Sequence, residues 1–77
     1  MEFEYDSEKS QANKTKHGLD FEEAQRVWED MDRLEVPARI VEGEERSLMI
    51  GRVSAKIWTA VFTRRGEAIR LISVRRA

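Results

Sequence analysis

The chain has 77 residues and no cysteine, so at most one domain must fold without disulfides or a thiolate metal site. Its net charge is −1, and its longest uncharged run, residues 57–63, is far too short to cross a membrane. The acidic N-terminus lacks a signal-peptide pattern, and the single histidine argues against zinc. We therefore expect a cytoplasmic protein with no metal, no cofactor and no membrane partner.

Charge is divided unevenly along the chain. Residues 1–45 carry 14 acidic and 6 basic side chains, a net charge of −8, whereas residues 46–77 carry 8 basic and 1 acidic, a net charge of +7. One interpretation is a basic surface built mainly by the C-terminal half. The other is that the two halves neutralise each other across the fold, and both interpretations stay open at this point.

The first predicted elements are a short strand and a polar helix. Residues 2–5 alternate polar and apolar, which indicates a strand with one buried face. Asp6 is a suitable N-cap for a helix that runs to about His17, and Gly18 takes the position after its end. This helix carries almost no apolar residue, so burial of a hydrophobic face does not explain it.

A second predicted helix follows at once. Asp20 and Glu23 have the spacing of a capping box. The apolar residues that follow recur at helical intervals and predict the helix that covers the core. They are Phe21, Ala24, Val27, Trp28 and Met31.

From residue 34 onward the hydrophobic period changes to two, which predicts strands. The predicted strands cover residues 34–41, 46–53, 56–63 and 67–75, with turns at 42–45 and 64–66. Pro37 indicates that the first of these is an edge strand, and the last two are apolar on both faces, as central strands are. The order β-α-α-β-β-β-β predicts an α+β domain in which an antiparallel sheet carries both helices on one face.

Arginines recur along the predicted strands. Alternation puts Arg46 and Arg52 on one side of their strand, while Arg70 and Arg76 share a side and Arg75 takes the opposite one. An exposed face with several arginines would suit a phosphate backbone, because the guanidinium fork binds phosphate through two parallel hydrogen bonds. The alternative is that these arginines flank the sheet and only keep the protein soluble.

Four segments are informative when taken together: FEYDSEKSQANKTKHGLDFEEA (3–24), GEERSLMIGR (43–52), VFTRRG (61–66) and IRLISVRRA (69–77). Together they resemble the BrnT family of toxin–antitoxin ribonucleases. The resemblance covers nearly the whole chain and implies a RelE-like fold and RNA cleavage without a metal ion. It also implies a ribbon-helix-helix antitoxin, BrnA. Operator DNA is expected to be bound only through this antitoxin. Family members usually continue into a charged C-terminal helix, which this sequence, ending at Ala77, is predicted to lack.

The resemblance also suggests catalytic residues. Attack by a 2′-hydroxyl needs one group to accept a proton, one to donate a proton, and cations for the phosphate. The candidates are Lys16, His17, Glu45, Arg46 and Arg75. Histidine exchanges protons near neutral pH, although His17 would also suit a helix C-terminus. Glu45 is either a general base or a surface partner of Arg46.

Further candidates are predicted to bind RNA. Lys9, Asn13 and Lys16 are spaced i, i+4, i+7, so one helix face is expected to meet phosphate. Arg70 and Arg76 are expected to add backbone contacts. Trp58 is either a core residue or a platform for a base. All these cations are expected to converge on one solvent-facing hollow.

The sequence thus favours a metal-independent endoribonuclease toxin. The alternative is a non-catalytic toxin remnant that binds an antitoxin or another protein through its sheet edge. A DNA-binding module is less consistent with the sequence, because no recognition-helix pattern is present and the overall charge is not basic.

Overall fold

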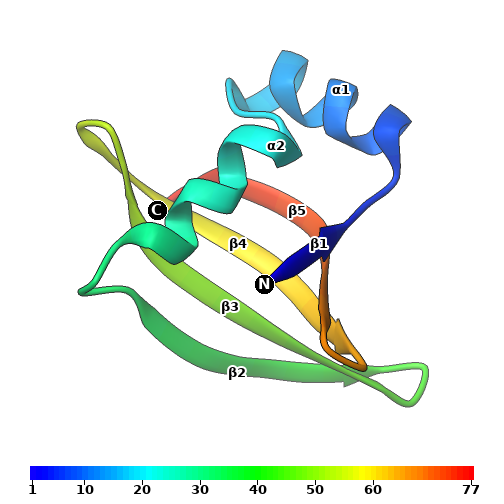
Figure 1. Ribbon diagram of the computed structural model, residues 1–77. Helices are drawn as coiled ribbons and strands as arrows, with labels where there is room; N and C mark the ends of the chain where they lie inside the picture. Colours follow the sequence, from blue (N-terminus) through cyan, green and yellow to red (C-terminus); the bar gives the residue numbers. More distant parts are fainter.

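The computed structural model describes all residues 1–77 as a five-stranded sheet with the helices gathered on one face (Figure 1). The elements are β1 (Glu2–Glu4), α1 (Ser7–His17), α2 (Phe21–Ala24), the 3₁₀-helix η1 (Gln25–Glu29), β2 (Leu34–Val41), β3 (Glu44–Val53), β4 (Lys56–Arg65) and β5 (Ala68–Arg76). The predicted α+β class is confirmed. None of the helices is both long and apolar enough to cross a membrane.

The sheet is mixed, with the strand order β1-β5-β4-β3-β2. Three successive hairpins make β2 to β5 antiparallel, but β1 lies parallel to β5. The prediction of a wholly antiparallel sheet is therefore wrong for β1, because alternation tells which face a side chain takes and not which way a strand runs. The edge position of β2, which contains Pro37, and the internal positions of β4 and β5 are as predicted.

Helix α1 has the predicted bounds. The Asp6 carboxylate accepts the Glu8 and Lys9 backbone N–H groups at 2.8 and 3.3 Å. At the other end Gly18 adopts a left-handed conformation with φ 91° and donates its N–H to the Lys14 carbonyl. Such a conformation favours glycine, so the helix ends where the sequence predicts.

Hydrogen bonds hold this polar helix to the rest of the fold. Ser10 and Asn13 are its two buried residues. The Ser10 hydroxyl accepts the Phe21 N–H at 2.9 Å. The Asn13 amide donates to the Leu19 and Val74 carbonyls at 2.7 and 2.8 Å and accepts the Val74 N–H at 3.2 Å. Because β1 pairs with β5 only at residues 68–70, Asn13 satisfies backbone groups of β5 that no strand reaches.

The second helix departs from its prediction. The capping box is present, with Asp20 accepting the Glu23 N–H at 2.7 Å and Glu23 accepting the Asp20 N–H at 3.0 Å. However, the α-helix lasts four residues and continues as η1, whose tighter turn shifts the later side chains. The chain becomes extended at Asp30, so Met31 is 94% exposed and does not belong to the predicted apolar stripe.

The core lies between the helices and the sheet. The Trp28 ring packs edge-on against the rings of Phe3 and Phe62, with centroids 5.1 and 5.2 Å apart. Gly51 of β3 lets η1 approach closely, because a Cβ there would lie 3.0 Å from both Cγ1 and the carbonyl oxygen of Val27. The opposite face of the sheet has no helix over it, and we call it the open face.

Candidate nucleic-acid interface

Asn13 brings two predicted groups of residues to the same end of the molecule. Lys16 and His17 follow Asn13 by three and four residues, about 4.5–6 Å along the helix axis. Arg75 and Arg76 directly follow Val74, the strand residue that Asn13 binds, at about 3.3 Å per residue. The C-terminal end of α1 and the C-terminal end of β5 therefore lie close together.

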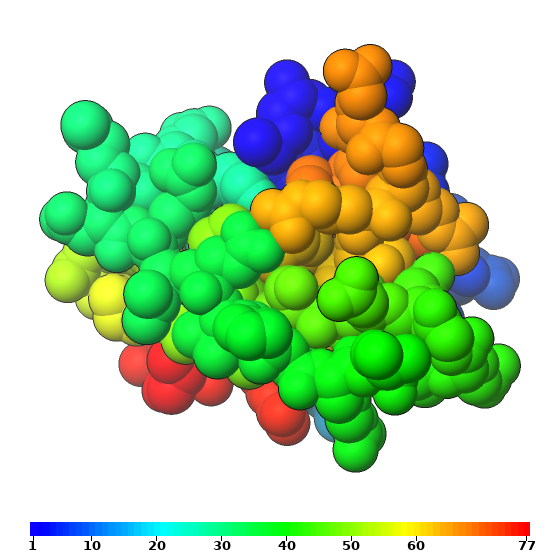
Figure 2. Space-filling model, turned by 90° about the horizontal axis from the view of Figure 1, so that it is seen from below, coloured from blue at the N-terminus to red at the C-terminus, as the bar shows by residue number.

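The turn between β3 and β4 adds another cation to this end. The Ala77 N–H donates to the Ile57 carbonyl at 3.1 Å, so the end of β5 lies beside the start of β4. Figure 2 shows the C-terminal residues (red) next to the residues after this turn (yellow). We call this region the cationic end and define it by Lys16, His17, Lys56, Arg75 and Arg76. No carboxylate forms an ion pair with any of these residues.

The two arginines of the cationic end take opposite faces of β5. The Arg76 guanidinium lies over the Trp58 ring on the helix-covered face, 5.8 Å from the ring centroid. Arg75, which pairs with Thr59, takes the open face and is exposed. The two guanidinium groups thus lie on either side of the end of the sheet, where a flexible polyanion could contact both.

The other end of the sheet is built differently. Near the β2–β3 and β4–β5 turns Arg46, Arg64, Arg65 and Arg70 each form an ion pair, whereas Arg39 of β2 forms none. We call this region the ion-paired end. The pairs are Arg46–Glu44 (3.8 Å), Arg64–Glu35 (2.7 Å), Arg65–Glu44 (3.5 Å), Arg65–Glu4 (4.0 Å) and Arg70–Glu4 (3.6 Å). The Arg46 Nε is buried and has no hydrogen-bond partner.

The predicted catalytic residues are therefore divided between the two ends. Arg75 pairs through Thr59 with Ile50, and Arg46 lies four residues farther along β3, about 13 Å away in the strand direction. Arg70 and Glu45 also lie at the ion-paired end. The expected convergence of all these groups on one hollow is not found, because the sequence does not give the register that separates them.

Two helix residues also differ from expectation in their surroundings. Asn13 is only 7% exposed, and its amide is fully engaged with Leu19 and Val74. Lys9 is exposed, but it lies seven residues from Lys16, about 10 Å along the helix. In the sequence, the near absence of apolar residues in this helix was the only indication that hydrogen bonds, and not hydrophobic packing, hold it to the fold.

Comparison with known proteins identifies the family of this chain. The profile of the family described as "Ribonuclease toxin, BrnT, of type II toxin-antitoxin system" matches residues 5–77. The chain belongs to the BrnT family. A search of curated proteins found no match. Members of the BrnT family are ribonuclease toxins, whose target is RNA and whose partner is a protein antitoxin.

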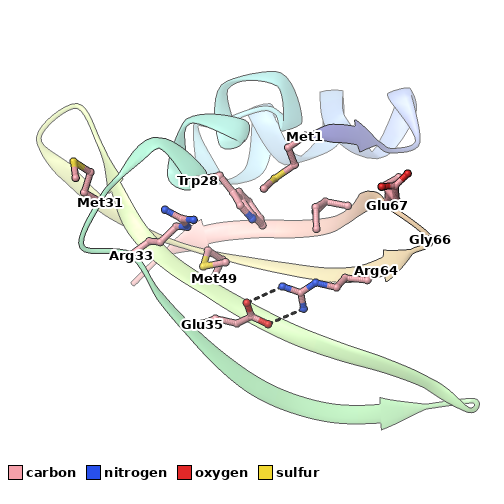
Figure 3. Close-up of a pocket in the computed structure, with 11 residues that line it drawn as sticks. Met1, Trp28, Met31, Arg33, Glu35, Met49, Arg64, Gly66 and Glu67 are labelled. Carbon is pink, nitrogen blue, oxygen red and sulfur yellow. Dashed lines mark hydrogen bonds and ion pairs between the residues drawn. The ribbon is translucent and has the colours of Figure 1, made fainter.

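The largest hollow of this BrnT-family chain does not contain the predicted site. A cavity of about 650 Å³ lies between the N-terminus, η1, β2 and the β4–β5 turn (Figure 3). Trp28 and Met49 point into it, and Arg64 binds both oxygens of Glu35 at 2.7 and 2.8 Å across its floor. None of the nine predicted site residues lines this cavity.

At the ion-paired end, one ion pair also shifts the pKa values of its side chains. The hydrogen bonds from Arg64 hold the pKa of Glu35 below its ordinary value, and the same bonds raise the pKa of Arg64. These two charges are therefore committed to each other. The side chains of the cationic end have no such partner. No group of three or more histidine, aspartate or glutamate side chains is arranged to hold a metal ion.

Proposed function

We propose that this BrnT-family chain is a metal-independent endoribonuclease toxin and that it cleaves RNA at the cationic end. The observation that carries the proposal is that the ends of α1 and β5 and the β3–β4 turn bring Lys16, Lys56, Arg75 and Arg76 to one end of the sheet, where none of them forms an ion pair. A scissile phosphate bound there would gain charge-assisted hydrogen bonds without first breaking an ion pair.

The reaction needs only groups that this end supplies. The 2′-oxygen loses its proton and attacks the adjacent phosphorus, and the bond from phosphorus to the 5′-oxygen breaks. The departing 5′-oxygen takes up a proton, which leaves a 2′,3′-cyclic phosphate and a 5′-hydroxyl. His17 is the residue suited to move the proton, while Lys16 and Arg75 stabilise the charge that develops on phosphorus.

The remaining predicted residues take secondary roles in this proposal. Arg46 and Arg70 are already paired with glutamates and lie at the ion-paired end, so this proposal does not assign them to the scissile phosphate. Glu45 lies too far along β3 to serve as the base for a phosphate at Arg75. A RelE-like fold relationship, a ribbon-helix-helix antitoxin and operator binding through that antitoxin remain expectations from the family resemblance.

The test combines the metal requirement with product chemistry. The purified chain is incubated with a defined RNA in excess EDTA, and the product ends are identified by mass spectrometry. We expect cleavage to persist and to yield 2′,3′-cyclic phosphate ends, and a single 2′-deoxy substitution at the cleaved position to block it. Loss of cleavage in EDTA, or cleavage of the deoxy-substituted strand at the same position, would contradict the mechanism.

A second candidate follows from the division of the predicted residues between the two ends. A chain that lacks a complete catalytic set would act only by binding its antitoxin. Co-purification with a small antitoxin, together with no cleavage of RNA by the freed toxin, would favour this candidate. Cleavage by the freed toxin would exclude it.

A further inference from the structure

A small hollow lies beside the cationic end, on the helix-covered side of the sheet. Its volume is about 260 Å³, and three segments enclose it: the start of the α1–α2 connection, the α2–η1 helix and the β3–β4 turn. The residues that line it are Leu19, Glu23, Arg26, Val53, Ser54, Ala55, Lys56 and Trp58. The hollow is thus adjacent to His17, two residues before Leu19, and to Lys56 of the cationic end.

The lining suits one flat aromatic ring that carries a phosphate. Its apolar part is formed by Leu19, Val53, Ala55 and Trp58. Leu19, Val53 and Trp58 are only 5–6% exposed and form the floor, whereas Ala55 is exposed at the rim. The volume is below the roughly 300–1,000 Å³ of pockets for drug-sized ligands, so it fits a single ring system. An apolar floor with a few polar groups at the rim is typical of sites for small aromatic ligands.

Two cations at the rim give the hollow its charge. Arg26 of η1 and Lys56 of β4 both line it, and neither forms an ion pair. A neutral aromatic ligand would leave these charges unused. A nucleotide would place its base against the apolar lining and its phosphate toward them.

Glu23 supplies an oriented acceptor in the same hollow. Its Oε1 accepts the Asp20 N–H at 3.0 Å and the Lys14 ammonium at 2.8 Å, and its Oε2 accepts no hydrogen bond. The Asp20 N–H, followed by Lys14, holds the pKa of Glu23 below its ordinary value, so the carboxylate stays ionised at neutral pH. The free oxygen can therefore accept an amino or ring N–H group, as acidic side chains do from cytosine.

We propose that this hollow binds one base of the RNA substrate next to the scissile phosphate, and that Glu23 selects bases with an exocyclic amino group. Guanine, adenine and cytosine offer such a donor. Uracil presents carbonyl oxygens on both sides of its single ring N–H, and these would face the carboxylate. The inference rests on the proposed cleavage at the cationic end and adds a preference for the neighbouring base.

Binding is tested with nucleoside 5′-monophosphates, followed through the two tryptophan indole N–H signals in ¹H–¹⁵N spectra. Trp28 lies in the core away from this hollow and serves as the internal reference. We expect the Trp58 signal to shift saturably and the Trp28 signal to stay fixed. GMP, AMP or CMP should bind about tenfold more tightly than UMP.

Variants separate base binding from folding. Glu23→Gln keeps the capping box, because glutamine also serves at this position, and we expect it to reduce the preference over UMP to within about twofold. Glu22→Gln, which alters an exposed neighbour outside the hollow, should leave the preference unchanged. Ala55→Leu fills the hollow from an exposed turn and should abolish the Trp58 shifts in a folded chain.

The outcomes distinguish this inference from the proposed function. Absence of any Trp58 shift, equal shifts of Trp28, or an unchanged preference in Glu23→Gln would overturn the inference. RNA cleavage with unaltered rate and base preference in Ala55→Leu would also overturn it and would leave the proposed function standing. Saturable Trp58 shifts in a chain that cleaves no RNA would instead overturn the proposed function.

Discussion

The two ends of the sheet carry similar numbers of basic side chains in different surroundings. At the ion-paired end Arg46, Arg64, Arg65 and Arg70 each have a glutamate within 4.0 Å. At the cationic end Lys16, Lys56, Arg75 and Arg76 have none. Availability for a polyanion therefore depends on which carboxylates the fold brings alongside, and not on the number of arginines.

This comparison explains the uneven distribution of charge along the chain. The acidic N-terminal half supplies Glu4, Glu35 and Glu44, which neutralise the arginines of β4, β5 and β3 at one end. The basic C-terminal half keeps its charge at the other end. Neutralisation between the two halves is thus found at the ion-paired end, and a basic surface at the cationic end stays a prediction.

The largest expected effect comes from removing one arginine at each end. Arg75→Ala should reduce the rate of RNA cleavage by about 100-fold or more, because a cation that stabilises the transition state is lost. Arg65→Ala, the matched change at the ion-paired end, should stay within about threefold. Cleavage rates in EDTA, measured beside circular dichroism spectra, check the pair. Equal losses in two folded variants would remove the functional distinction between the ends.

A second comparison concerns what holds each end together. Asn13→Ala leaves the Val74 N–H and the Val74 and Leu19 carbonyls without their partner, so it should lower the free energy of unfolding by about 2–4 kcal/mol. Arg64→Ala, which removes an exposed ion pair, should cost at most about 1 kcal/mol. Urea denaturation of both variants measures the difference. A larger loss in the free energy of unfolding for Arg64→Ala than for Asn13→Ala would contradict this comparison.

The salt dependence of RNA binding gives a smaller effect. Lys16→Met removes one charge and keeps the aliphatic stem, so the slope of log affinity against log salt should fall in magnitude by about 0.7. Arg65→Met should leave the slope unchanged. Fluorescence anisotropy with a 2′-O-methyl oligonucleotide, which cannot be cleaved by 2′-hydroxyl attack, provides the measurement. If only Arg65→Met changed the slope, RNA would bind at the ion-paired end, which would contradict the proposal.

The smallest expected effect is on pH-dependent stability at the ion-paired end. The pKa of Glu35 is lowered in the folded chain, so its contribution is present above its ordinary value of 4.5 and is lost as the pH falls through the lower folded value. Wild-type protein should therefore lose up to about 1 kcal/mol more stability between pH 6 and pH 3 than Glu35→Gln. Thermal unfolding across this range tests the sign. At neutral pH, Glu35→Gln should cleave RNA at the wild-type rate.

Local features were the predictable part of this structure. The Asp6 cap, the left-handed Gly18, the Asp20–Glu23 capping box and the edge position of Pro37 each follow from a few neighbouring residues. The parallel pairing of β1 and the early end of the second helix were not predicted. Strand direction depends on the path of the whole chain, and the extended turn at Asp30 depends on its bond to the Arg52 N–H of β3.

For the candidate site, the sequence predicts which kinds of side chain are present but not which of them lie near one another. The sequence indicates which side chains can contact phosphate, and it correctly connects Lys16 and His17 with a helix C-terminus. It does not reveal that the Asn13 amide is buried by its hydrogen bonds to the Val74 backbone. It also does not reveal that the sheet register separates Arg46 from Arg75. Such information resides in contacts between residues up to 61 positions apart.

The contact between Asn13 and Val74 also bears on self-association. Exposed strand edges recruit further strands and lead to aggregation. Here β1 is only three residues long, β2 is interrupted near Pro37, and a side-chain amide occupies part of the remaining border of β5. A second molecule thus finds no long regular border to extend, so Asn13→Ala should increase the formation of intermolecular sheets as the protein unfolds.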